Sequence, residues 1–312
     1  MKKINLLILI TLSFIAITLT NCNNTAKQRN IISVSILPQK YFIDALTNEA
    51  IEVNVMIPPG SSHATYSPTS QQFKKLSDSK LYIGIGHLGY EQAWMPRLAE
   101  LNNNMQIVIL TEHIQLISDE HHNDIKSENS HNSAEYENEQ KHKNDHDHVH
   151  GVDPHIWMSP KTVLEILPTI KSSLIKSFPE LKDTIETNYI ELYSKISEAD
   201  KHMASVSKLF SKKEFLIFHP ALTYLARDYG LVQTAVEQEG KEPSPAYLAR
   251  IINKAKKESI PVIFIQEEYD IRNAQTVSHE AGIALVQINP MSYNWLEMME
   301  KLTQTLEYYL NE

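Results

Sequence analysis

The chain has 312 residues and a formal net charge of −9 at pH 7, because 38 acidic side chains outnumber 29 lysines and arginines. This length is sufficient for two domains of ordinary size. The acidic balance argues against a nucleic-acid partner, which requires a basic surface, and it is compatible with binding of a cation.

The first 22 residues have the pattern of a secretory signal. Lys2 and Lys3 precede the apolar run 4–19, whose length is typical of a signal peptide and short for a membrane span. The run ends close to Cys22, the only cysteine of the chain. This resembles a bacterial lipoprotein signal, in which such a cysteine carries the lipid; an ordinary secretory signal with an incidental cysteine is the alternative. Residues 23–30 are predicted to form a polar tether.

Two segments of the remaining chain alternate short β-branched runs with helical stretches, which favours buried parallel strands with helical crossovers. We expect an α/β fold with two four-stranded lobes, over residues 31–178 and 211–312. The expected strands cover 31–36, 51–57, 81–86, 105–110, 214–218, 231–238, 261–266 and 284–288. The expected helices cover 39–46, 69–79, 90–101, 221–230, 244–259, 272–282 and 293–310.

Residues 179–210, between the two lobes, are predicted to form one long linking helix. Apolar side chains recur there every three or four positions, at Leu181, Ile185, Tyr189, Leu192, Ile196, Ala199, Met203, Val206 and Phe210. No glycine or proline interrupts the pattern after Pro179, so the helix would extend for roughly 45 Å. A helix of this length predicts a rigid connection between the lobes.

Residues 119–150 fit neither lobe. They contain seven histidines and nine acidic residues but only four apolar side chains, too few to offset the entropy of ordering the segment. We therefore expect a disordered, histidine-rich acidic loop. Its histidines form a candidate auxiliary site for weak metal binding: His121, His122, His131, His142, His146, His148 and His150.

Three histidines follow strands or braced turns, where ligands of open α/β sheets bind. His219 directly follows the strand at 214–218, His63 follows the strand at 51–57, and His155 lies between Pro154 and Pro160. Three imidazoles from separate loops would suit Zn²⁺ better than Mg²⁺ or Ca²⁺, which prefer oxygen ligands.

The segments "DPHIWMSP", "FHPALTYLARDYGL" and "EQEGKEPSP" together resemble the metal-binding subunits of bacterial zinc and manganese ABC importers. The resemblance covers the chain from about residue 31 to its end. It implies two α/β lobes joined by a long rigid helix, capture of a divalent metal at the lobe interface, and delivery to a membrane permease with its ATPase. Manganese members usually have a glutamate in place of His219 and an aspartate near Asn289. Both differences, and the histidine-rich loop, favour zinc.

The first ligand departs from the family pattern. Members usually carry their histidine one residue later than His63, at the position of Ala64 here. We expect His63 as the ligand, with His87 or Glu91 as its substitute. Water or Glu91 would complete the fourth position.

The sequence thus predicts a monomeric, extracytoplasmic and lipid-anchored Zn²⁺-binding protein that is not an enzyme. The alternatives are a manganese-binding importer subunit or a metal-scavenging surface adhesin on the same fold. A zinc hydrolase, with Glu91 or Glu268 activating water, is a further alternative. The absence of an HExxH motif argues against the hydrolase.

Overall fold

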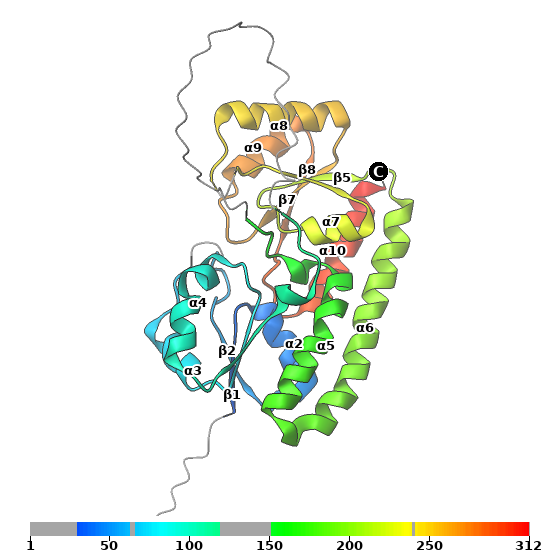
Figure 1. The fold of residues 1–312 in the computed structure, drawn as a ribbon. Helices are drawn as coiled ribbons and strands as arrows, with labels where there is room; N and C mark the ends of the chain where they lie inside the picture. The colour runs from blue at the N-terminus through cyan, green and yellow to red at the C-terminus, as the bar shows by residue number, and fades with distance from the viewer. Residues whose placement is uncertain (1–29, 63–65, 119–150, 239–240, 312) are drawn as a thin grey trace, which may run out of the picture. The chain divides into compact units, whose positions relative to one another are not determined.

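The computed structural model of the protein describes residues 30–62, 66–118, 151–238 and 241–311. Two four-stranded parallel sheets form its frame (Figure 1). The first sheet has the order β2-β1-β3-β4 and the second the order β6-β5-β7-β8, so the predicted α/β fold with two lobes is confirmed. The strands are β1 Ile31–Val34, β2 Glu52–Val55, β3 Leu81–Gly84, β4 Gln106–Ile109, β5 Glu214–Ile217, β6 Val232–Ala235, β7 Val262–Gln266 and β8 Ala284–Ile288.

Helices connect the strands at the predicted places, and one more, α5, stands where the sequence analysis set no limits. Their limits are α2 Leu37–Thr47, α3 Ser70–Ser77, α4 Gly89–Leu101, α5 Pro160–Ser177, α7 Thr223–Tyr229, α8 Pro245–Glu258, α9 Arg272–Ala281 and α10 Trp295–Leu310. Short 3-10 turns cover η1 Leu110–His113, η3 Ile156–Met158 and η4 Pro179–Leu181. Two helix ends carry the residues usual there: the Ser244 side chain caps α8, and Gly230 ends α7 in the left-handed conformation at φ +68°.

The predicted linking helix is confirmed as η4 followed by α6, Lys182–Leu209, which has 28 residues. Its apolar stripe faces inward: Ile185, Leu192, Ile196 and Met203 are buried. Helix α6 packs against α5 and α2 of the first lobe and against α10 of the second (Figure 1). The helix is therefore supported by both lobes along its length.

The second sheet is covered on both faces at its centre, which explains why the central strands β5 and β7 are almost entirely apolar and buried. Along β5, Phe215 and Ile217 belong to the larger core, whereas Leu216 and Phe218 belong to a smaller core beneath α8 and α9. The larger core continues through α5, α6 and α10 into the first lobe. The two sheets consequently share one apolar interior.

Two tryptophans join the turn at η3 to the end of the chain. Trp157 donates its indole N–H to the Pro290 carbonyl at 2.9 Å, and Trp295 donates its own to the Trp157 carbonyl at 2.7 Å. Trp295 also packs edge-on against Phe42 of α2, with ring centroids 5.3 Å apart. These contacts fix the backbone two residues after His155.

Several predictions concern residues beyond these ranges. The signal at 1–22, most of the tether and the histidine-rich segment 119–150 lie outside the described residues, and the domain limits that depend on them remain predictions. Within the described ranges, no helix combines the length and apolar character that a membrane crossing requires.

Candidate metal site

His155 is held by the aspartate two residues before it. Asp153 accepts hydrogen bonds at one carboxylate oxygen from both the backbone N–H and the Nδ1 of His155, each at 2.8 Å. The backbone of Asp153 is fixed in turn by Ile117 at 3.0 Å and by the Tyr224 hydroxyl at 2.9 Å. The His155 side chain is only 3% exposed. Its orientation is therefore set before any ligand binds.

His219 is held in an equivalent way in the second lobe. It follows β5 at the point where the strand order of the sheet reverses, between β5 and β7. Gln266, at the end of β7, donates to the His219 carbonyl at 2.6 Å, and Glu237 lies 2.6 Å from the His219 Nδ1. The ring of Tyr269 stacks on the imidazole with centroids 5.2 Å apart.

The two imidazoles approach each other through their Nε2 atoms, because a carboxylate holds each Nδ1. The Nε2 atoms of His155 and His219 are 3.2 Å apart. Two nitrogens bonded to one tetrahedral Zn²⁺ at about 2.0–2.1 Å would lie about 3.3 Å apart. A carboxylate on the Nδ1 side fixes the tautomer and makes Nε2 the metal-binding nitrogen. Two such acceptors at this distance repel each other unless a cation joins them, so the pair has the geometry of two zinc ligands.

The surroundings of the pair are acidic and partly closed to water. Burial raises the pKa of the Glu268 carboxyl, and the nearby His219 opposes this shift only in part. Burial also raises the pKa of the Tyr269 phenol, with Glu237 and Glu268 adding to the effect and a hydrogen bond with Ser62 opposing it. The contact with Ser62 shows that the loop after β2 reaches the His219 side of the site.

The other predicted ligands have different outcomes. His63 directly follows Ser62 in the chain but lies outside the described residues. His87 is half-buried, and its carbonyl accepts a weak bond from Gln92 at 3.4 Å. Among the side chains that the structure describes, no cluster of three or more histidines, cysteines or acids is placed to hold a metal. The structure brings together His155 and His219, and it leaves the first-lobe ligand a prediction.

Glu91 has a structural role inside the first lobe. Its side chain is fully buried and accepts hydrogen bonds from the backbone N–H groups of Ile85 at 2.8 Å, Gly86 at 2.6 Å and Leu88 at 3.2 Å, and from the Ser35 hydroxyl. Both carboxylate oxygens are thus occupied in closing the start of α4. The structure does not bring Glu91 to the histidine pair.

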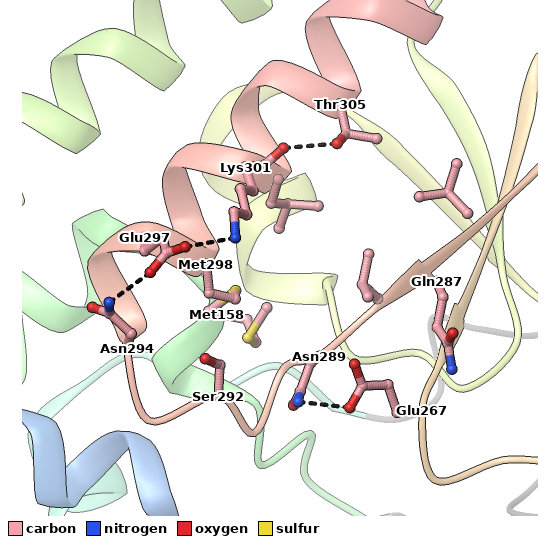
Figure 2. A pocket seen from close by; sticks show the side chains of 13 residues that line it. Met158, Glu267, Gln287, Asn289, Ser292, Asn294, Glu297, Met298, Lys301 and Thr305 are labelled. Atoms are coloured by element: carbon pink, nitrogen blue, oxygen red, sulfur yellow. Dashed lines mark hydrogen bonds and ion pairs between the residues drawn. The ribbon is translucent and has the colours of Figure 1, made fainter.

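Asn289 also has a structural role. Its side chain donates to Glu267 at 2.8 Å and accepts from the Met291 N–H at 3.0 Å, which shapes the turn after β8. This turn borders a cavity of about 330 Å³ between β8 and α10 (Figure 2). Neither His155 nor His219 lines that cavity, so it is separate from the candidate metal site.

The sequence did not predict two residues that position the histidines. Asp153 and Glu237 occur in the segments "DPHIWMSP" and "EQEGKEPSP", but only the fold shows that their carboxylates hold the imidazoles. Asp153 had a local signal, an acid two residues before a histidine in a proline-braced turn. Glu237 had a weaker one, an acid close to the end of a predicted strand.

Replacing Glu237 with glutamine should lower zinc affinity about 10- to 100-fold, the usual effect of removing a partner of a metal-binding histidine. The amide can still accept the Nδ1 hydrogen bond, but it no longer raises the basicity of the ring. Competition against a chelator of known affinity measures the change. Glu267→Gln removes an exposed charge nearby and should have little effect; equal losses in both variants would contradict the positioning role.

Comparisons with known proteins identify relatives that bind zinc. A family model described as ZnuA, zinc-uptake complex component A periplasmic, matches residues 32–308. The zinc-binding lipoprotein AdcA of Streptococcus pneumoniae strain R6 is 27% identical over 326 residues, covering 98% of this chain and 61% of that protein. The chain thus spans about three-fifths of the length of that relative.

A relative closer in size and a solved structure extend the likeness. The high-affinity zinc uptake system protein ZnuA of Bacillus subtilis is 25% identical over 262 residues, covering 83% of this chain and 78% of that protein. A crystal structure of ZnuA superposes with a TM-score of 0.77 at 26% identity, covering 91% of this chain and all of the other (100%).

Proposed function

The chain belongs to the ZnuA family of periplasmic zinc-uptake components, and from this membership we propose that it captures Zn²⁺ outside the cytoplasm and delivers it to the permease of an ABC importer. The observation that carries the proposal is the His155–His219 pair, with Nε2 atoms 3.2 Å apart and a carboxylate on each Nδ1. Zinc is the cargo of such a protein, which would act as a monomer and catalyse no reaction.

The nitrogen ligands support zinc over manganese. Borderline metals such as Zn²⁺ suit imidazole, whereas Mn²⁺ prefers carboxylate and carbonyl oxygens. Two of the carboxylates beside the pair, Asp153 and Glu237, are committed to the histidine Nδ1 atoms and are not free to serve Mn²⁺. Equilibrium competition between the two metals, followed by elemental analysis of the purified protein, tests this preference. A higher affinity for Mn²⁺ would support the manganese alternative.

A transport experiment tests delivery. Cells that lack the protein should grow poorly when zinc is chelated, and the intact chain should restore growth and ⁶⁵Zn uptake. The variant His219→Ala should restore neither, although it is produced at the same level. A hydrolase assay with zinc present should show no turnover; zinc-dependent hydrolysis lost in the same variant would favour an enzyme.

His63 is the proposed first-lobe ligand, because the preceding residue already contacts Tyr269 beside His219. His63→Ala should weaken zinc binding about 10²- to 10³-fold, as expected for one ligand out of four. His87→Ala should change the affinity little. Titration of both variants against a zinc chelator distinguishes the two residues. A large loss only in His87→Ala would assign the ligand to the loop after β3.

The histidine-rich segment is proposed to bind further zinc weakly and to raise its concentration near the site. Deleting residues 121–149 should leave one tight zinc site and the unfolding temperature of the metal-free protein unchanged. Weaker zinc equivalents should disappear. Calorimetric titration and thermal unfolding measure the two effects, and a many-fold weaker tight site would show that the segment has a structural role.

We also propose that Cys22 carries a lipid that holds the protein at a membrane surface. The name of the matched family and the lipoprotein relative support an extracytoplasmic location and such an anchor. Mass spectrometry of the membrane fraction should detect acylated Cys22 in the intact protein. A soluble product cleaved at another bond would support an ordinary secretory signal.

A further inference from the structure

A short helix of the second lobe connects the two histidines of the metal pair. Helix α7 begins at Thr223, four residues after His219, and packs against η3 and α5, which follow His155 in the chain (Figure 1). Its side chains therefore reach from one histidine to the turn that carries the other, residues 153–159. The contacts with that turn and with the chain on either side of it come from Tyr224, Arg227 and Asp228.

Tyr224 holds the chain before His155. The Tyr224 side chain is fully buried, and its hydroxyl donates to the Asp153 carbonyl at 2.9 Å and accepts from the Ile117 N–H at 3.4 Å. The Asp153 N–H donates in turn to the Ile117 carbonyl at 3.0 Å. One phenol thus ties two backbone segments to α7, and the second of these segments carries the carboxylate that orients His155.

Asp228 holds the chain after His155. Its side chain is only 3% exposed, and one carboxylate oxygen accepts from the hydroxyls of Ser159 at 2.5 Å and Thr162 at 3.2 Å. The other oxygen accepts from the Arg227 Nε at 2.8 Å. Ser159 is the N-cap of α5, so Asp228 fixes the start of that helix four residues after His155.

Arg227 joins these two contacts. Its guanidinium lies over the Tyr224 ring at 4.9 Å, and it donates to the Gln115 carbonyl at 3.1 Å and to the Thr162 hydroxyl at 3.3 Å. Arginine suits this place because its planar group offers several donors and also packs on an aromatic face. The turn that carries His155 is therefore held at both ends by one helix.

The spacing of the pair matters because both Nε2 atoms, 3.2 Å apart, are acceptors that repel each other when no cation joins them. If the imidazoles could move apart, metal binding would have to bring them together again, and this cost would lower the affinity. The spacing suits Zn²⁺, for which two bonded nitrogens lie about 3.3 Å apart. A larger ion such as Cd²⁺ takes longer bonds and a wider pair.

We propose that α7 sets the spacing of the metal pair and thereby favours Zn²⁺ over larger divalent ions, and that it acts through Tyr224, Arg227 and Asp228. The three side chains position the ligands and do not bind the metal themselves. The proposal rests on the zinc capture proposed above and adds to it the residues that determine the choice of ion.

Zinc and cadmium affinities of Tyr224→Phe, each measured by competition with a chelator, test the proposal. Phenylalanine keeps the ring and its packing, and it removes only the hydroxyl that binds Asp153. Zinc affinity should fall about tenfold, the lower end of the effect of removing a partner behind a metal ligand, and cadmium affinity about threefold or less. A general loss of structure would weaken the binding of both metals equally, and that result would overturn the proposal.

Tyr293→Phe is the matched control. The Tyr293 hydroxyl also crosses between the lobes, but it donates to Asp44 of α2 at 2.8 Å and not to the turn of His155. The control should lower the stability of the metal-free protein against urea and leave the ratio of zinc to cadmium affinity unchanged. A ratio that falls as far in Tyr293→Phe as in Tyr224→Phe would overturn a specific role of α7.

Arg227→Met decides if Tyr224→Phe does not fold, because the Arg227 side chain is 33% exposed and methionine can keep its packing on the ring. Its zinc affinity should fall about threefold, as expected for partly exposed polar contacts, and cadmium affinity less. An unchanged ratio in the variant that folds overturns this proposal alone. Absence of tight zinc binding in the unaltered protein overturns the proposed function as well.

Discussion

Replacing His155 with alanine should raise the dissociation constant for zinc about 10²- to 10³-fold. Protein sites with four ligands bind zinc with about 10–16 kcal/mol, so one ligand accounts for about 3–4 kcal/mol. His155 is 3% exposed and its Nε2 lies 3.2 Å from that of His219, so no water-exposed side chain can readily take its place. His219→Ala should have an effect of the same size.

Competition with a high-affinity chelator, followed by elemental analysis, measures these losses. His279→Ala is the matched control, because this imidazole is 87% exposed on α9 and pairs only weakly with Glu280. Zinc affinity of the unaltered protein should also fall in acid solution, since only neutral imidazole binds a metal. Tight binding that persists in His155→Ala would overturn the assignment of the site.

Replacing Trp157 with alanine should reduce the free energy of unfolding by about 3–5 kcal/mol, the typical cost of removing a buried tryptophan. Trp157 is 1% exposed and packs in the apolar interior that the two sheets share. Its loss also leaves the Pro290 carbonyl without the indole N–H that donates at 2.9 Å. The variant should therefore unfold at a lower denaturant concentration.

Urea unfolding of the metal-free protein, followed by circular dichroism, gives the comparison without stabilisation by zinc. Trp157→Phe keeps most of the volume and removes only the hydrogen bond, so it should cost about 1–2 kcal/mol. Equal effects of the two variants would mean that the hydrogen bond, and not the packing, dominates. A loss below about 1 kcal/mol in Trp157→Ala would contradict the structural role of this residue.

The elements of the fold were predictable because their signals are local. Buried strands such as β5 and β7 appear as short apolar runs, and Ser244 and Gly230 mark helix ends by their own chemistry. The inward stripe of α6 follows from its spacing alone. The limits of α5 could not be set in this way, because Pro168 lies inside that helix and proline ordinarily signals a break.

The candidate site was predictable only in part. His155 and His219 stand in positions that sequence can identify, after a braced turn and after a strand. Their positioning partners depend on tertiary contacts, since Glu237 reaches His219 across 18 residues of sequence. Glu91 was a plausible ligand as an acid near a loop, but its oxygens are bound by backbone N–H groups that become available only when β3 turns into α4.

Helix α6 has a consequence for how the length of this chain can vary. A helix converts each inserted residue into a rotation of about 100° and a shift of about 1.5 Å for everything that follows. Because α6 packs against helices of both lobes, one added residue would turn the side that carries His219 away from the side that carries His155. The number of residues between the two ligands is thus constrained by the helix that lies between them in the chain.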